Sequence, residues 1–230
     1  MTKELLESLR NKLIVFEGGD KTGKTTIAEM LCDYLNSFGI TSVSTFQPGD
    51  QSYGALASIM RSLCKDKRWE LHPLSVFFAF QLDRVEIVSK KIIPNLDIGN
   101  TVISDRWVYS TYAYQILGQE LYRFMPSIVS DWFMDEAVFN LKPDIVFYFP
   151  EMITGQKNKN VWDSFETKED SFTQRVCDGY EELSQLNNWI KVYPESTPEK
   201  TFASLLLKYD EYLKEISGGI NVQKQNKRAF

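Results

Sequence analysis

The stretch Phe16–Thr26 reads FEGGDKTGKTT, and the part from Gly18 to Thr25 follows the spacing G-x-x-x-x-G-K-T. The apolar run Leu13–Phe16 precedes it, and a helical pattern begins at Lys24. A strand, a glycine-rich turn and a helix in this order predict a phosphate-binding loop, whose backbone N–H groups point at phosphate oxygens. The Lys24 ammonium is expected to reach the outer phosphates, and the Thr25 hydroxyl to ligate Mg²⁺. The predicted phosphate-binding residues are Gly18, Gly19, Asp20, Lys21, Thr22, Gly23, Lys24, Thr25 and Thr26.

The bulk composition bounds the class of protein. The chain has 230 residues, 43% of them hydrophobic, which is enough to form a core. Its formal net charge of −5 argues against non-specific binding to nucleic acid. The three cysteines, Cys32, Cys64 and Cys177, are scattered, which favours a reduced, intracellular setting over a disulfide framework or a metal site. Because Met1–Lys12 lacks the apolar core of a signal peptide and no apolar run approaches the ~20 residues of a membrane span, we expect a cytoplasmic protein without nucleic-acid or membrane partners.

Strand-like and helix-like segments alternate along the chain. Apolar and β-branched runs predict strands at Leu13–Phe16, Thr41–Phe46, Thr101–Ser104, Asp144–Phe149 and Trp189–Val192. Helical spacing of apolar residues predicts helices at Lys24–Phe38, Tyr53–Cys64, Pro73–Ile93, Val108–Gly118, Met125–Phe139, Phe172–Leu186 and Pro198–Ile216. His72 is expected to lie at the entry of the third helix, and Pro94 to end it. The alternation predicts an α/β fold, in which helices cover both faces of a five-stranded parallel sheet.

No repeat or linker divides the chain, so we expect a single domain over residues 1–230, with its core at about 12–216. The polar segment at about 151–170 is expected to be a mobile lid, and the segment 217–230 a frayed tail.

The loop alone is compatible with switch GTPases, ATPase motors and small-molecule kinases. A GTPase is expected to carry N-K-x-D after a strand, and the near match Lys157–Asn160 has no Asp at that position. The strand Thr101–Ser104 is followed by Asp105 and Arg106, a pair suited to phosphoryl transfer between two bound anions. Asp105 can hold Mg²⁺ and Arg106 can clamp an acceptor phosphate, although a helix-capping Asp beside a surface Arg is the alternative.

Four motifs together resemble the thymidylate kinase family. That family opens with F-E-G-x-D-x-x-G-K-[ST]-T, which Phe16–Thr26 fits at every position. Its second signature, D-R-[YWH]-x-x-S-x-x-A-Y-Q, matches Asp105–Gln115. Its F-x-x-[ADN]-R helix matches Phe80–Arg84, and Lys142–Asp144 resembles its P-D-[LI] element. The resemblance runs from about Leu13 to Tyr209.

The resemblance implies a P-loop NTPase fold with strand order 2-3-1-4-5, a homodimer, and transfer of a phosphoryl group from ATP to dTMP with Mg²⁺. It implies a catalytic set consisting of Lys21, Lys24, Asp105 and Arg106, of which Asp105 would hold the metal together with Thr25. The implied dTMP-binding residues are Asp20, Arg61, Phe80, Arg84, Arg106, Thr111, Tyr114 and Gln115.

Several of these residues also have plain structural interpretations. Asp20 either accepts a hydrogen bond from a sugar 3′-hydroxyl or only forms the turn. Lys21 and Arg61 either contact phosphate or are solvated charges. Phe80 and Arg84 lie four apart on one helical face, where they can read a base, or they serve as a core ring and a surface charge. In the same way Tyr114 either closes the pocket against the sugar or is a core tyrosine.

The chain departs from the family at two places near the expected base pocket. Phe46 and Gln47 stand where bacterial members have a basic and an acidic residue, and Ile116 and Leu117 follow Gln115 where many have glycines. These departures leave open a broader deoxynucleoside monophosphate kinase. A non-catalytic nucleotide-binding protein is the alternative of another class.

Overall fold

The structure is a computed structural model that describes residues 3–49, 59, 62, 66, 71–150 and 170–217. Three predictions lie outside the described residues, apart from isolated positions. They concern the helix at 53–64 with Arg61, the lid at 151–170, and the tail at 217–230.

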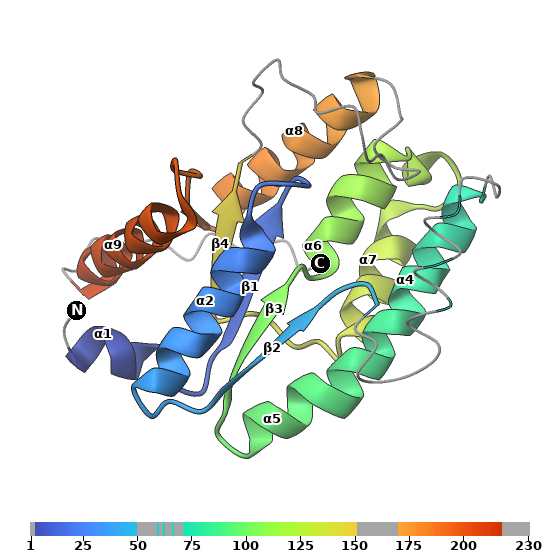
Figure 1. The fold of residues 1–230 in the computed structure, drawn as a ribbon. Helices are drawn as coiled ribbons and strands as arrows, with labels where there is room; N and C mark the ends of the chain where they lie inside the picture. Colours follow the sequence, from blue (N-terminus) through green and yellow to red (C-terminus); the bar gives the residue numbers. More distant parts are fainter. Residues whose placement is uncertain are drawn as a thin grey trace.

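The centre of the molecule is a five-stranded sheet (Figure 1). Its strands are β1 (Leu13–Gly18), β2 (Ser42–Phe46), β3 (Thr101–Asp105), β4 (Ile145–Phe149) and β5 (Ile190–Lys191). All neighbouring strands are parallel, and their order is β2-β3-β1-β4-β5. The predicted fold class and strand order are therefore confirmed. The carboxyl ends of β1 and β3 meet at one edge, where Phe16 pairs with Asp105.

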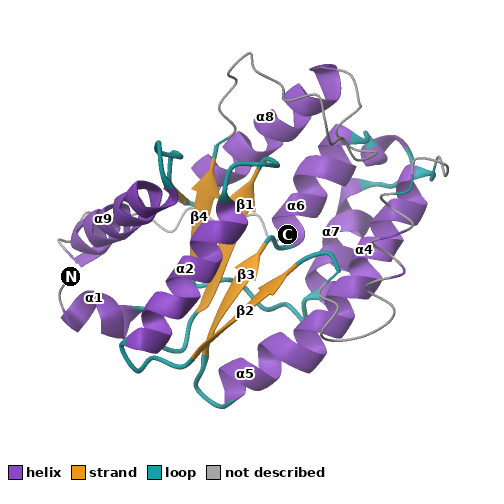
Figure 2. Ribbon diagram, in the orientation of Figure 1, coloured by secondary structure: helices purple, strands orange, loops and turns teal. Residues whose placement is uncertain are grey.

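Helices surround the sheet (Figure 2). The α-helices are α1 (Lys3–Ser8), α2 (Lys24–Ser37), α4 (Pro73–Ile87), α5 (Ile93–Asp97), α6 (Val108–Thr111), α7 (Ser127–Ala137), α8 (Asp170–Leu186) and α9 (Pro198–Ser217). Two π-helical segments, η2 (Val88–Ile92) and η3 (Tyr112–Gly118), extend α4 and α6, and η4 (Leu121–Arg123) is a 3₁₀ turn. Among these described helices, we find none with the length and apolar character needed to cross a bilayer.

Alternation along the strands sorts the core into two layers. Leu13 and Val15 of β1 face one layer, which α4, α6, α7 and α8 cover together with η2 and η3. Ile14 and Phe16 face the other layer, which α1, α2 and α9 cover. Because β1 is buried at every position, both layers fix the strand that leads into the phosphate-binding loop.

Most predicted helix boundaries lie within two residues of the observed ones, and the helices that begin at Pro73 and near Met125 differ in an informative way. Pro94 does not end its helix: η2 leads directly into α5, in which Pro94 is the second residue, and α5 continues to Asp97. A π-helical turn changes the hydrogen-bond spacing, so the missing N–H of a proline interrupts the helix less. The predicted helix at Met125–Phe139 is shorter, because Pro126 is extended and α7 begins only at Ser127. His72 is at the entry of α4, as predicted, where its Nδ1 accepts a hydrogen bond from the Leu74 N–H at 3.2 Å.

Candidate active site

The loop between β1 and α2 depends on two glycines with positive φ angles. Gly18 has φ 139°, and a Cβ atom there would lie 2.1 Å from the Phe149 carbonyl oxygen. Gly23 has φ 83° and is the N-cap residue of α2. Only glycine fits the first position, and the second turns the backbone so that α2 begins beside the loop.

Lys24 is 5% exposed and lies under this loop. Its Nζ donates to the Gly19 carbonyl oxygen and, at 3.3 Å, to Thr22 Oγ1. Burial, together with the nearby Arg106 charge, lowers the pKa of Lys24 to about 8. In the described part of the chain its hydrogen-bond partners are neutral oxygens. Such a buried ammonium is suited to an anionic ligand, because a phosphate group would offset the cost of burying its charge.

The end of β3 brings a carboxylate to the start of α2. Thr25 Oγ1 donates to Asp105 Oδ2 at 2.5 Å. The other carboxylate oxygen, Asp105 Oδ1, is buried and has no hydrogen-bond partner among the described residues. A hydroxyl and an unpaired carboxylate oxygen are hard ligands that fit Mg²⁺ or its bound water. Within the described ranges no three His, Cys, Asp or Glu side chains cluster. Mg²⁺ usually keeps several waters and binds phosphate oxygens beside one or two carboxylates, which these two residues would allow.

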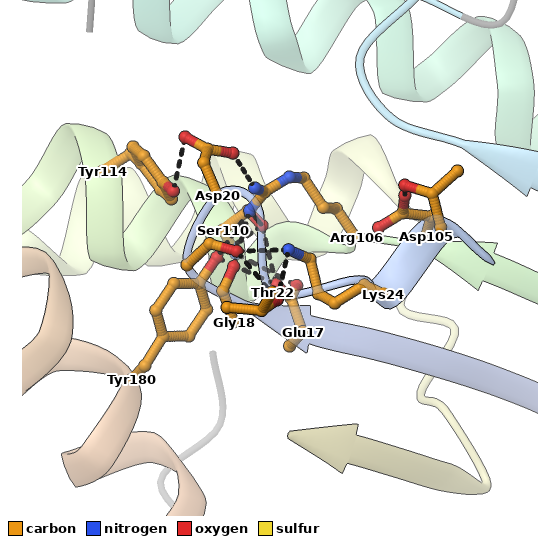
Figure 3. A network of polar contacts seen from close by, with 12 residues as sticks. Glu17, Gly18, Asp20, Thr22, Lys24, Asp105, Arg106, Ser110, Tyr114 and Tyr180 are labelled. Atoms are coloured by element: carbon orange, nitrogen blue, oxygen red, sulfur yellow. Dashed lines mark hydrogen bonds and ion pairs between the residues drawn. The ribbon is translucent and has the colours of Figure 1, made fainter. Parts of the chain in front are cut away.

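Arg106 adopts an unusual backbone conformation, with φ 77°. Its Nη2 forms an ion pair with Asp20, and its guanidinium lies 5.1 Å from the centre of the Tyr114 ring. Tyr114 in turn donates its hydroxyl to Asp20 Oδ2 at 3.0 Å (Figure 3). Burial acts to raise the pKa of Asp20, but the charges of Arg106 and Lys24 and the tyrosine hydrogen bond hold this pKa below its ordinary value. The loop carboxylate is therefore ionised and directed at the strand-end arginine.

Arg84 of α4 is 3% exposed, which excludes the surface-charge interpretation. Its donors are all directed at neutral acceptors. Nε donates to Gln47 Oε1 at 2.9 Å, and Nη1 donates to Thr111 Oγ1 at 2.8 Å. Nη1 also reaches Gln81 Oε1 at 3.2 Å, and Nη2 reaches the Trp107 carbonyl oxygen at 2.9 Å. Burial lowers the pKa of Arg84 to about 10, so the guanidinium stays charged at neutral pH.

One cavity of about 540 Å³ joins the phosphate-binding loop to the Arg84 cluster. Predicted site residues that line it are Asp20, Lys21, Thr22, Gly23, Lys24, Thr25, Thr26, Phe80, Arg84, Asp105, Arg106, Thr111, Tyr114 and Gln115. Gly18 and Gly19 shape the loop without lining the cavity, and Arg61 lies outside the described residues. Phe80 both lines the cavity and packs on Val76, so its two interpretations are compatible.

Sequence reasoning gave no role to four residues that complete this region. Gln47, a departure from the family pattern, lines the cavity and accepts a hydrogen bond from Arg84. Glu17, Ser110 and Tyr180 form a buried cluster behind Arg106. A charged residue inside the buried run of β1 was the available signal for Glu17, since a carboxylate is rarely buried without partners.

A loop built for phosphate and a buried, aromatic-lined arginine cluster thus face each other across a single cavity. This arrangement suits a P-loop kinase that transfers a phosphoryl group between two nucleotides.

Comparison with known proteins narrows the class. The family model for thymidylate kinase matches residues 16–204. Thymidylate kinase from Carboxydothermus hydrogenoformans is 31% identical over 198 residues, which cover 84% of this chain and 94% of the relative. That of Blochmanniella floridana is 30% identical over 213 residues, covering 89% and 98%. The crystal structure of thymidylate kinase from Ehrlichia chaffeensis superposes with a TM-score of 0.64 at 28% identity, covering 90% of this chain and 98% of the other. The chain belongs to the thymidylate kinase family.

Proposed function

We propose that the protein transfers the γ-phosphoryl group of ATP to dTMP, giving dTDP and ADP. The observation that carries the proposal is the shared cavity, in which Lys24 at one end and Arg84 at the other line the same space. A donor phosphate chain and an acceptor nucleotide can therefore lie end to end without water between them.

On the donor side, the loop binds the ATP phosphates and Lys24 neutralises charge as it develops on the transferred group. Thr25 and Asp105 would hold Mg²⁺, which when bound screens the negative charge of the phosphate oxygens. Lys21 lines the same end of the cavity, where its backbone has φ 61°. We assign its ammonium to the transferring phosphate as a second, exposed source of positive charge.

On the acceptor side, Arg106 holds the dTMP phosphate in line with the donor. In this structure Asp20 forms an ion pair with Arg106, so the acceptor phosphate competes with Asp20 for the guanidinium. A displaced Asp20 is free to accept a hydrogen bond from the sugar 3′-hydroxyl, beside Tyr114. The base occupies the far end of the cavity, where Phe80, Arg84, Thr111 and Gln115 read it. Arg61, which lies outside the described residues, stays a prediction as a contact of the acceptor phosphate.

A broader deoxynucleoside monophosphate kinase is the second candidate, and Gln47 is the observation that favours it. Its neutral amide faces Arg84 at 2.9 Å, where bacterial family members carry an acidic residue. The charge and the donor pattern around the base therefore differ from those of such members.

An acceptor panel tests the proposal. Purified protein is given ATP and Mg²⁺ with dTMP, dUMP, dCMP, dGMP or dAMP, and ADP release is measured. We expect dTMP to be the preferred acceptor. Turnover of dCMP or dGMP comparable to that of dTMP would establish the broader kinase, and ATP binding with no acceptor phosphorylated would establish a non-catalytic protein.

The matched control is Lys24→Ala. It removes the ammonium that faces the donor phosphates, so we expect kcat to fall by about 10² or more while the circular-dichroism spectrum stays unchanged. Undiminished turnover in this variant would show that the loop is not the catalytic one.

The oligomeric state and the cellular location of the protein are also proposed. We propose a homodimer, which is supported by apolar side chains exposed on α4 and α7, namely Phe78, Leu82, Ile128, Val129 and Trp132. We also propose a cytoplasmic location, supported by the scattered spacing of the three cysteines.

A further inference from the structure

Glu17 is a fully buried carboxylate for which the reaction described above has no use. It is the next-to-last residue of β1 and has 0% exposure, between Phe16 and the loop residue Gly18. Burying a carboxylate is costly unless several donors surround it. Its hydrogen-bond donors come from Trp107, Ser110 and Tyr180. Trp107 follows Arg106 in the chain, and the hydroxyls of the other two also bond to Arg106.

The first oxygen of Glu17 holds the backbone that follows Arg106. Oε1 accepts hydrogen bonds from the Trp107 N–H at 2.7 Å and the Ser110 N–H at 3.1 Å. Trp107 is the N-cap residue of α6 and supplies no side-chain cap of its own. Glu17 thus caps α6 from β1. It also fixes the chain directly after Arg106, whose positive φ angle is unfavourable for a residue other than glycine.

The second oxygen of Glu17 holds the Arg106 side chain through two hydroxyl groups. Oε2 lies 2.7 Å from Ser110 Oγ and 3.0 Å from the Tyr180 hydroxyl oxygen. Arg106 Nη1 donates to these same two oxygens, at 3.1 and 2.9 Å. Because a guanidinium has donors only, both hydroxyl oxygens accept from Arg106 and direct their protons toward Glu17 (Figure 3).

The two terminal nitrogens of the Arg106 guanidinium have different partners. Nη1 is also held by the Gly18 carbonyl oxygen at 3.1 Å, so its acceptors are Gly18, Ser110 and Tyr180. Nη2 makes its ion pair with Asp20, a residue that lines the cavity. We propose that Glu17 is a positioning residue for Arg106, which acts through Ser110 and Tyr180 to keep Nη2 directed at the acceptor phosphate. The inference rests on the proposed function, in which Arg106 binds that phosphate.

Glu17→Gln is the sharpest variant, because it keeps the volume and one carbonyl oxygen for the two backbone N–H groups. Its new amide N–H₂ group would face the hydroxyls of Ser110 and Tyr180, which now donate to Glu17 and accept from Arg106. These hydroxyls would lose their acceptor and meet a second donor. We expect kcat/KM for dTMP to fall about tenfold to a hundredfold, with KM for ATP changed by less than about twofold. If KM for ATP rose by as large a factor as kcat/KM for dTMP fell, the proposal would be overturned.

A double-mutant cycle with Arg106→Ala separates positioning from general stability. If Glu17 acts through Arg106, Glu17→Gln causes no further loss of kcat/KM in the Arg106→Ala background. If the fold-losses of kcat/KM in the two single variants multiplied in the double variant, Glu17 would act independently of Arg106. That result would overturn the inference about Glu17 but not the proposed role of Arg106. Wild-type activity in Arg106→Ala itself would overturn the proposed role of Arg106 and the inference together, so the two failures differ.

A second variant keeps the test valid should Glu17→Gln fail to fold. Tyr180→Phe removes one of the two bridging hydroxyls and keeps the ring, and we expect kcat/KM for dTMP to fall about fivefold to tenfold. Tyr209→Phe is its matched control, since that buried tyrosine bonds to Ser8 at 3.0 Å, away from the cavity. Equal activity of the two tyrosine variants would contradict the proposal.

Discussion

At the scale of single residues, the two loop glycines are needed for different reasons. Gly18 has no room for a side chain, whereas Gly23 has room and only its positive φ angle favours glycine. Both have positive φ, but a Cβ at Gly18 would overlap the Phe149 backbone, while one at Gly23 would meet nothing within 4 Å. We expect Gly23→Ala to lower the free energy of unfolding by about 1–2 kcal/mol. Gly18→Ala is expected to cost more than about 3 kcal/mol or to prevent folding, because β1 and β4 must separate to admit the methyl group.

Urea denaturation of the two glycine variants measures the difference. The comparison controls for the positive φ angle that both residues share. A Gly18→Ala variant as stable as Gly23→Ala would show that the spacing between β1 and β4 is not what selects glycine at this position.

Lys24 predicts a pH dependence. Its pKa of about 8 in the nucleotide-free protein lies below the ordinary value of 10.5, and burial is the main cause. The unfolded chain therefore binds more protons than the folded protein between these two values, and the Lys24 contribution to the free energy of unfolding rises with pH in that window. Below pH 8 both states are protonated and the full cost of burying the charge is present.

We therefore expect wild type to gain stability relative to Lys24→Met as the pH rises from 8 toward 10.5. Denaturation of both proteins at pH 7, 8, 9 and 10 measures the difference, in which other titrating groups cancel. Over the same range kcat/KM for ATP should decline, because the ammonium that faces the phosphates is lost. A stability difference independent of pH would mean that Lys24 keeps an ordinary pKa.

At the scale of elements, the contact between α8 and η3 depends on glycines that allow the two helices to pack closely. It lies against η3, and a Cβ at Gly118 would come within 2.7 Å of the Phe172 ring and 3.2 Å of the Ala113 carbonyl oxygen. We expect Gly118→Ala to lower the free energy of unfolding by about 1–3 kcal/mol. It is also expected to reduce kcat/KM for dTMP, because α8 carries Tyr180, which contacts Arg106.

Gly179→Ala is the matched comparison on the other side of this contact. Its Cβ would meet the end of the flexible Leu117 side chain, and alanine favours the helix by about 1 kcal/mol over glycine. We expect its stability to lie near that of wild type. A Gly179→Ala variant more damaging than Gly118→Ala, by thermal melting and by kinetics, would reverse this account of the interface.

The elements also show how far sequence reasoning reaches. The loop, Asp105 and Arg106 could be placed together from local patterns, because carboxyl ends of parallel strands meet at one edge. Local patterns carry no information on contacts between distant segments. Glu17 and Tyr180 are 163 positions apart, and most acceptors of Arg84 come from segments far from α4, at Gln47, Trp107 and Thr111.

At the scale of the whole molecule, several exposed apolar side chains lie together on α4 and α7. Phe78 contacts Phe133 with ring centres 5.4 Å apart, and Trp132 contacts the same ring at 4.9 Å. The aromatic contacts therefore connect α4 to α7. Leu82 lies one turn beyond Phe78, and Ile128 one turn before Trp132, so these residues extend the surface along both helices. We interpret this apolar surface as the contact face of the proposed homodimer.

We expect wild type to have twice the 26.7 kDa mass of the chain by light scattering at micromolar concentration. Leu82→Asp combined with Ile128→Asp places two charges on side chains that are 47% and 76% exposed, so it should yield folded monomers. Leu207→Asp is the matched control, because Leu207 is 65% exposed on α9, which covers the opposite layer of the core. Its mass should remain that of wild type. A monomeric wild type, or a double variant that stays dimeric, would refute the assignment of this surface to a second copy of the chain.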